Sequence, residues 1–308
     1  GFYIGRFQPY HNGHHTVIEH IADEVPLMEF GPAVAVAAAY AVLFALERLV
    51  PLRPASRNLK SRLLTNGVMT ALTFLTGALL VRSCALGATY QAQVWNIGLL
   101  QWLPLSAPWL GVAGFLLMDL TFYWWHRANH EIPLLWRFHA AHHVDPDLDV
   151  TTAFRFHLVE IAYSTPFRVL QVLVLGISPA VYITYELSFQ LATLFHHSNL
   201  RLPLWLERAV NRVFVTPRMH GIHHSQVRQE TDSNYSVIFR FWDYLHRTLL
   251  LCVPQSWVNI GVPGYTSPRD NRPGALLLMP FRAQRAPRKK ESRDEDTELP
   301  GQPTTLVE

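Results

Sequence analysis

Cysteine and charge are both scarce in this chain of 308 residues. The two cysteines, Cys84 and Cys252, lie far apart and form no CxxC pair, so the chain has neither a disulfide framework nor a thiolate metal site. Charged residues make up 16%, which is below the roughly 25% typical of soluble domains. The formal net charge of +3 is too small and too dispersed to indicate a nucleic-acid partner.

Several catalytic motifs are absent as well. The chain contains no HExxH motif of a zinc protease, no GxSxG turn of a hydrolase and no Walker loop for nucleotide phosphates. The Glu-x-x-His pairs of soluble di-iron bundles do not accompany its histidines. What remains is a chain with many apolar residues and many histidines, and both are unevenly distributed.

Apolar residues, 49% of the chain, are gathered into long runs. Residues 30–46 carry no charge, and residues 66–81 and 109–125 form two further runs. Each run is close to the length that crosses a bilayer as a helix. Residues 157–197 read as a helical hairpin whose turn lies at Gly176. We therefore expect an all-α protein with several transmembrane helices and a histidine-rich helical cap on the cytoplasmic side.

The positive-inside rule orients these spans. Segment 47–62 is rich in arginine and lysine, so we expect it in the cytoplasm. Counting spans from there places His126 and the end of the hairpin at the cytoplasmic face. Arg168 and Glu186 would lie at similar depth inside the hairpin, where they either pair or extend to the interface as snorkelling side chains.

Histidines form three clusters near the ends of these runs. The first cluster consists of His126 and His130, which are four residues apart, so a helix would place them on one face. The other two clusters share the spacing i, i+3, i+4. Neutral imidazole is the commonest side-chain metal ligand near neutral pH, and eight imidazoles exceed what one tetrahedral ion requires. The pattern therefore predicts two metal ions, bound by His126, His130, His139, His142, His143, His220, His223 and His224.

The three clusters read H-R-A-N-H, H-A-A-H-H and H-G-I-H-H, and they resemble the histidine boxes of the fatty acid hydroxylase and sterol desaturase superfamily. The flanking D-L-T-F-Y-W-W-H-R and T-T-A-F-R-F-H-L-V-E, and N-Y followed by W-D, also fit, and the resemblance covers about residues 35–250. It implies two non-haem irons, O2 as oxidant, a lipid substrate and an external electron-donor protein. It also adds His197 to the ligands. Zinc could replace iron in purified samples.

Four further residues are candidates for the same site. We expect His157 either to bind metal, to support a metal ligand or to line a substrate channel. We expect His196 either to bind metal or to pack beside His197. Ring N–H groups that do not face a metal need acceptors, and Asp119 and Glu160, the latter near His157, are candidates. Asp119 could equally make a buried structural hydrogen bond.

The two ends of the chain differ from its middle. Residues 1–25 resemble the start of archaeal-type nicotinamide-nucleotide adenylyltransferases, with an HxGH signature from His11 to His14, and should form a strand, a turn and a helix. One βα unit cannot bury its own faces, so we interpret this segment as a fusion or cloning scar that binds no nucleotide. Residues 26–275 are expected to form the membrane domain, and residues 276–308 a disordered tail.

The sequence thus predicts a multi-pass membrane oxidoreductase that depends on iron and O2. Its substrate would be a fatty acyl, sterol or other isoprenoid lipid, which it hydroxylates or desaturates at the cytoplasmic face. Two alternatives share the histidines, namely a metal transporter, whose ligands should lie near mid-membrane, and a zinc-binding relative without oxidative chemistry. A nucleotidyltransferase would rest on residues 1–25 alone. The oligomeric state is left open.

Overall fold

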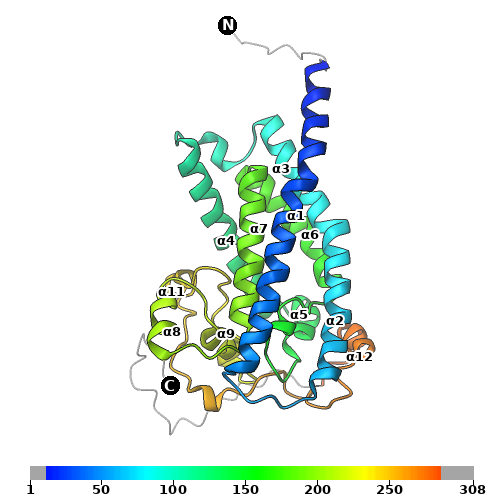
Figure 1. Cartoon of the computed structure of the whole chain (residues 1–308), viewed down its shortest axis with the longest axis vertical. Coiled ribbons are helices and arrows are strands. Elements are labelled where there is room, and N and C mark those ends of the chain that lie inside the picture. The colour runs from blue at the N-terminus through cyan, green and yellow to red at the C-terminus, as the bar shows by residue number, and fades with distance from the viewer. Residues whose placement is uncertain (1–11, 286–308) are drawn as a thin grey trace.

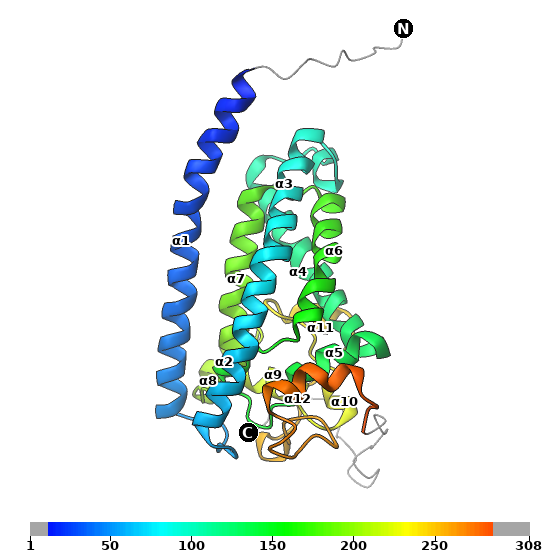
Figure 2. The ribbon, with the colours of Figure 1, turned by 90° about the vertical axis from the view of Figure 1, so that its right-hand side faces the viewer.

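The computed structural model describes residues 12–285, with side chains from residue 31 onward (Figure 1). Within that range regular structure is helical, apart from three isolated β-bridges. The expected all-α fold is therefore confirmed. In this part of the chain five long helical segments lie side by side and form a bundle (Figures 1 and 2). They are α1 (Asn12–Leu49), the rod formed by α2 (Leu59–Thr76), η1 (Gly77–Arg82) and α3 (Ser83–Trp95), then α4 (Ala107–Glu131), α6 (Leu158–Leu175) and α7 (Pro179–His197).

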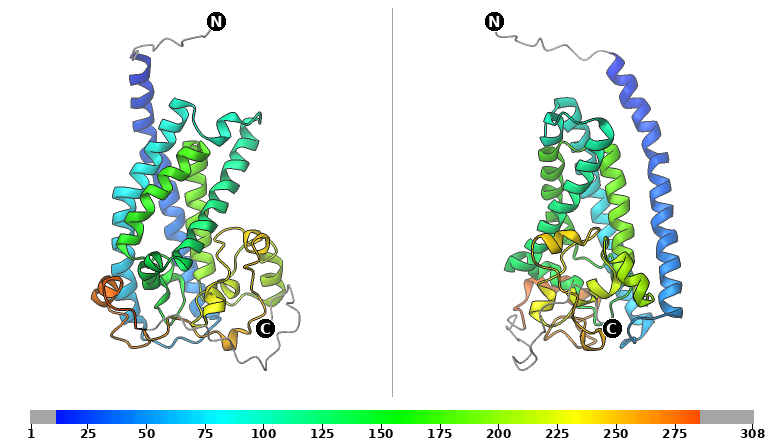
Figure 3. Two further views of the ribbon diagram at one scale, coloured as in Figure 1. Left: turned by 180° about the vertical axis from the view of Figure 1, so that it is seen from behind. Right: turned by 90° about the vertical axis from the view of Figure 1, so that its left-hand side faces the viewer.

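Among the described residues, three stretches are long and apolar enough to cross a membrane, namely Gly31–Leu49, Leu59–Trp102 and Leu158–Leu175. The expected third span, residues 109–125, lies in α4, which is not among them. That helix contains Asp119 and ends in the polar residues H-R-A-N-H-E. It nevertheless runs beside the other long helices in every view, so it belongs to the same bundle (Figures 1 and 3).

Two loops meet closely at the end of the bundle farther from the histidines. Gly176 ends α6 with φ +74° and starts the turn to α7, as expected for the hairpin. Gly98 has φ +105°, and a Cβ atom there would overlap the backbone of Gly176. Glycine is the residue that takes both conformations without a steric cost. The side chain of Gln101 also donates a hydrogen bond to the carbonyl of Gly176 at 3.1 Å.

The charged residues of the hairpin form a pair. Arg168 on α6 and Glu186 on α7 approach to 3.1 Å between Nη2 and Oε1. Of the two expected arrangements, pairing inside the bundle is the one that the fold adopts. Charged groups at this depth are costly unless they are paired.

The opposite end of the bundle carries a cap of short helices (Figures 1 and 3). Its sequence is rich in proline and in residues that end helices, which keeps each helix short. The cap comprises α5 (Pro133–His143), η3 (Val150–Thr152), α8 (Leu204–Val210), α9 (Pro217–His223), α10 (Arg228–Thr231), α11 (Phe241–Leu245), η4 (Gln255–Trp257), α12 (Pro273–Leu278) and η5 (Met279–Phe281).

Buried ion pairs attach this cap to the foot of α2. Arg62 pairs with Asp145 at 3.0 Å and also with Asp149, while Arg155 pairs with Asp145 at 3.1 Å. Burial alone would raise the pKa of Asp145, but Arg62 and Arg155 outweigh it and hold that pKa below its usual range. The carboxylate of Asp145 therefore stays ionised and ties the loop that follows α5 to α2.

The expected segment boundaries fall inside helices. Residues 12–25 continue without a break into the first apolar run as α1, whereas His11 lies outside the described residues and the side chain of His14 is not described. At the other end, α12 crosses the expected boundary at 275. Leu276 and Met279 pack against Met69 of α2, so the ordered chain extends beyond that boundary. The apolar run A-L-L-L-M there has a face to bury, which a disordered tail would lack.

Candidate metal centre

The histidine clusters come together where α4, α5, α7 and α9 end. His126 and His130 occupy the last turns of α4, and the second cluster lies on α5. His197 ends α7, and the third cluster lies on α9 and at its C-cap. All nine predicted ligands lie at one end of the bundle, as the expected topology requires.

These nine side chains form two groups, and in each group the candidate ligand atoms lie within 4.8 Å of one another. All nine are buried, with at most 8% exposure. Imidazoles buried this closely are a fitting donor set for two transition-metal ions. The first group is His126, His130, His139, His143 and His223, and the second is His142, His197, His220 and His224.

Helical spacing explains how each cluster serves both groups. On α5, His139 and His143 are four residues apart and enter the first group, while the intervening His142 enters the second. On α9 the roles are exchanged, because the pair four residues apart enters the second group and the single residue between them, His223, enters the first. At about 3.6 residues per turn, residue i+4 projects slightly to one side of residue i and residue i+3 slightly to the other, so the pair i, i+4 can enter one group while residue i+3 enters the next. The groups adjoin where His143 stacks on His224 at 4.1 Å between ring centroids.

Hydrogen bonds fix the orientation of several rings. The Nδ1–H groups of His126 and His223 donate to the carbonyls of Tyr235 and Ser233, each at 2.7 Å. The Nδ1–H group of His197 donates to the carbonyl of Thr193, one turn earlier in α7, at 2.8 Å. With Nδ1 engaged in this way, Nε2 is the atom left to face the group, as it is for most metal-bound histidines with an anchored second nitrogen.

Nε2 atoms of neighbouring histidines meet at 3.0 to 3.2 Å in four pairs. Metal–nitrogen bonds of about 2.0–2.1 Å would place two ligand nitrogens about 2.9 Å apart at a right angle and about 3.3 Å apart at the tetrahedral angle. The observed separations lie within that range. Burial lowers the pKa of His142, His143 and His220 well below the ordinary value, so these rings are neutral. Neutral rings whose lone pairs converge fit a bound cation.

The two carboxylate candidates play different parts. Glu160 accepts a hydrogen bond from Nδ1–H of His139 at 2.7 Å, so its partner is a ligand candidate rather than His157. Asp119 accepts from the indole N–H of Trp242 at 2.8 Å and from the backbone N–H of Phe239 at 3.2 Å. Asp119 therefore joins α4 to α11 and to the residue Phe239 before it, which is the structural alternative considered for it.

His157 and His196 lie outside both groups. His157 caps α6 by accepting from the backbone N–H of Val159, and its Nε2–H donates to the carbonyl of Leu277 at 3.1 Å. Both of its ring nitrogens are thus engaged elsewhere. The ring of His196 lies against that of His220 at 4.1 Å, so it is packed beside the second group without joining it.

One segment that supports the site, the loop held by Asp243, was not among the predicted site residues. Asp243 accepts hydrogen bonds from the backbone N–H groups of Tyr235 and Ser236 at 2.8 and 3.0 Å, so it holds the loop whose carbonyls orient His126 and His223. The signal was present in the sequence, because the N-Y and W-D pairs that fitted the resemblance include Tyr235 and Asp243.

A cavity of about 720 Å³ lies in the bundle and reaches two residues that contact candidate ligands. Residues of α1, α2, η1, α6 and α7 line it, and most of its surface is apolar. Its histidine end includes Glu160, which binds His139, and Phe156, which stacks on His142 at 4.3 Å between ring centroids. Figures 2 and 3 show α1, one wall of this cavity, at the outside of the bundle. An extended hydrocarbon chain fits such a space.

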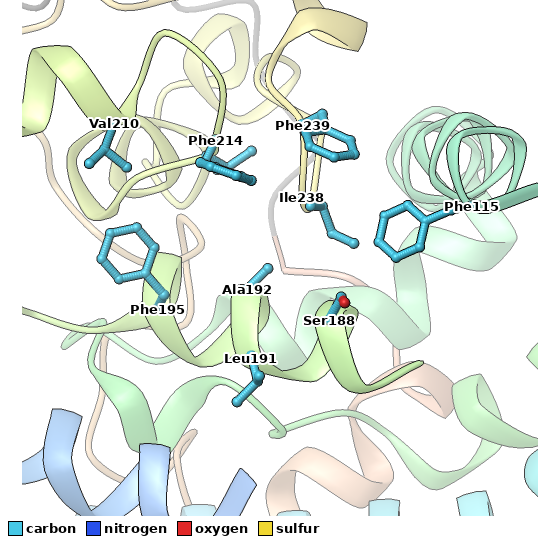
Figure 4. Close-up of a pocket in the computed structure, with 10 residues that line it drawn as sticks. Phe115, Ser188, Leu191, Ala192, Phe195, Val210, Phe214, Ile238 and Phe239 are labelled. Carbon is cyan, nitrogen blue, oxygen red and sulfur yellow. The ribbon is translucent and has the colours of Figure 1, made fainter. Parts of the chain in front are cut away.

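A second cavity of about 370 Å³ lies on another side of α7 (Figure 4). Phe115, Phe195, Phe214 and Phe239 line it, together with smaller residues that include Ser188. Neither cavity has a histidine in its lining. The larger one is lined by Glu160 and Phe156, which contact His139 and His142, so it is the one that adjoins the candidate metal centre.

Comparison with known proteins finds similar sequences over the region that holds the histidines. Residues 111–248 match the fatty acid hydroxylase family model, a range that contains all nine histidines. The chain is 33% identical to human alkylglycerol monooxygenase over 153 residues, which are 47% of this chain and 32% of that protein. It is 31% identical to ornithine lipid hydroxylase OlsE of Rhizobium tropici over 156 residues, 50% of this chain and 45% of that protein. It is 30% identical to a very-long-chain aldehyde decarbonylase of Oryza sativa over 142 residues, 43% of this chain and 22% of that protein.

This chain thus spans less than half the length of each of these relatives. No solved structure matches it. Each of the relatives acts on a lipid or a long-chain aldehyde according to its name, and the likeness falls on the region that holds the histidines.

Proposed function

Residues 111–248 match the fatty acid hydroxylase family model, and on this basis we propose an iron- and O2-dependent membrane oxidoreductase that hydroxylates or desaturates a lipid. The observation that carries the proposal is the convergence of nine buried histidines into two adjoining groups at the end of an apolar cavity. The nine are proposed as ligands of two non-haem irons. Redox-active iron supplies the oxidising power to break an unactivated C–H bond, which zinc lacks.

The protein's own residues would orient the metal ligands, bind the lipid chain and shield the site from water. Glu160 and the carbonyls of Tyr235 and Ser233 hold three ligand rings in place, so little motion is needed when metal binds. Phe156 covers His142 on the cavity side, and the apolar walls keep bulk water away from the reacting carbon. These features favour a lipid chain over a water-soluble substrate.

The overall reaction defines what else the enzyme requires. Hydroxylation consumes the lipid, O2, two electrons and two protons, and it yields the hydroxylated lipid and water. We propose that the electrons come from a separate protein on the cytoplasmic side. That side is assigned to the histidine end because the basic segment 47–62 lies there.

The test measures metal content and O2 consumption of the purified full chain supplied with reductant. We expect about two irons per chain, and O2 consumption that depends on a lipid. His142→Ala and His223→Ala remove one ligand from each group and should lower both readouts. His246→Ala is the matched control, because this half-buried histidine lies outside both groups and stacks on Tyr123.

Full activity in either ligand variant would contradict the proposed site. Two tightly bound zinc ions without O2 consumption in iron-supplied protein would instead support the zinc-binding relative. A transporter is disfavoured because the candidate ligands lie at one end of the bundle rather than along it. Residues 1–25 are proposed to have no part in the reaction, and neither His11 nor His14 is assigned a role.

A further inference from the structure

The large cavity contains a charged pair at a distance from the histidines. Arg168 and Glu186 both line the cavity, and they form the 3.1 Å ion pair between α6 and α7. Arg168 lies eight residues beyond Glu160 along α6, which corresponds to about 12 Å of helix. Glu186 lies eleven residues before His197 along α7, or about 16 Å. The pair therefore sits roughly 12–16 Å from the candidate metal centre, measured along the helices.

The two charged residues differ in their burial and in their other contacts. Arg168 is 5% exposed, donates to Gln171 at 3.2 Å and lies over the ring of Phe122 at 4.7 Å. Gln171 in turn donates to the carbonyl of Met118 on α4 at 3.0 Å, and the guanidinium also lies over the ring of Phe189 on α7 at 5.4 Å, so the arginine is held from several sides. The side chain of Glu186 is 24% exposed, and it contributes to the cavity wall. Glu186 is thus the partner that a ligand can reach.

Stability does not explain why this pair is present. Replacing a buried ion pair by apolar side chains of similar volume is often neutral or stabilising, because desolvation cancels much of the attraction between the charges. An alkyl chain beside Glu186 would strip water from the carboxylate without replacing its hydrogen bond. A ligand that donates a hydrogen bond at this depth would remove that cost.

We propose that the Arg168–Glu186 pair binds a hydroxyl group of the lipid substrate. The substrate class is then a long-chain or ring lipid whose hydroxyl is separated from the oxidised carbon by about 12–16 Å of hydrocarbon. A cationic group fits less well, because Arg168 and Arg82 both line the cavity with Glu186. This inference rests on the proposed function for the identity of the oxidised end, but the binding of the hydroxyl does not require turnover.

The experiment compares long-chain alcohols with alkanes of matching length. Binding to the metal-loaded full chain is measured by displacement of a fluorescent polyene alcohol, and oxidation of the same lipids is measured separately. The double variant Arg168→Met/Glu186→Leu removes both charges and leaves apolar side chains. Ser188→Ala is the matched control on α7, because Ser188 lines the second cavity instead.

We expect the double variant to bind the alcohols about tenfold or more weakly, as for the loss of a hydrogen bond to a charged group, and to bind the alkanes almost unchanged. Glu186→Gln should lie between the double variant and the wild type, and it serves as the readout if the double variant does not fold. Equal losses for alcohols and alkanes, or no loss for either, would overturn the inference. Selective alcohol binding without oxidation of any lipid would leave this inference standing and defeat the proposed function.

Discussion

Replacing Glu160 should release metal from one histidine group and leave the other group loaded. Its carboxylate accepts from His139 at 2.7 Å, and both side chains are buried. The bond fixes the ring orientation and makes the imidazole a stronger donor to metal. Because His139 belongs only to the first group, the effect should be confined to that group.

The size of the effect follows from the contact that is lost. Removing a partner that orients a metal-bound histidine costs 10- to 100-fold in metal affinity, or about 1.4–2.8 kcal/mol. Glu160→Gln keeps an oxygen acceptor but loses the charge, so it should fall at the weaker end of that range. Glu160→Ala removes the acceptor and should fall at the stronger end.

A chelator titration of iron-loaded protein measures this directly. Wild type should lose its irons at higher chelator concentration, whereas the Glu160 variants should lose about half of their iron early. Asp119→Asn is the control, because its carboxylate binds Trp242 and Phe239 rather than a histidine. An unchanged titration in Glu160→Ala, or early loss of all the iron, would refute the division into two groups.

Three further predictions concern the fold and its orientation. Arg62→Met removes the cation that Asp145 and Asp149 share and leaves Asp145 with Arg155 and Asp149 with Arg48, so it should destabilise the protein by less than the about 3–5 kcal/mol of a fully unpaired buried charge and still lower its melting temperature. Lys60→Met, at an exposed neighbour, should leave the melting temperature unchanged. Gly98→Ala should also lower the melting temperature, because its Cβ would overlap Gly176. Gly87→Ala, where a Cβ meets nothing within 4 Å, should raise the melting temperature or leave it unchanged. Equal shifts in the two variants would contradict the close approach of the two loops. A cysteine at the exposed Ser56 should be labelled only from the cytoplasmic side and one at Ser106 only from the other side, and the reverse pattern would overturn the proposed orientation.

Local periodicity in the sequence was sufficient to predict the long apolar helices and the clusters of histidines. The i, i+3, i+4 spacing acts within a single helix, so the clusters on α5 and α9 could be identified from sequence alone. Each long helix reverses the direction of the chain, and counting reversals placed His126 and His197 at the same end of the bundle. The hairpin turn at Gly176 was also predicted, because glycine there takes a left-handed conformation.

Only the tertiary structure decided which distant residues meet. The division of the nine histidines into two groups depends on how four helix ends converge, and the partner of Glu160 proved to be His139, 21 residues away. Asp119 turned out to bind Trp242, 123 residues away, and Arg168 proved to pair with Glu186 across the hairpin. Contacts of this kind depend on helix rotation and packing, which no pattern confined to one helix can specify.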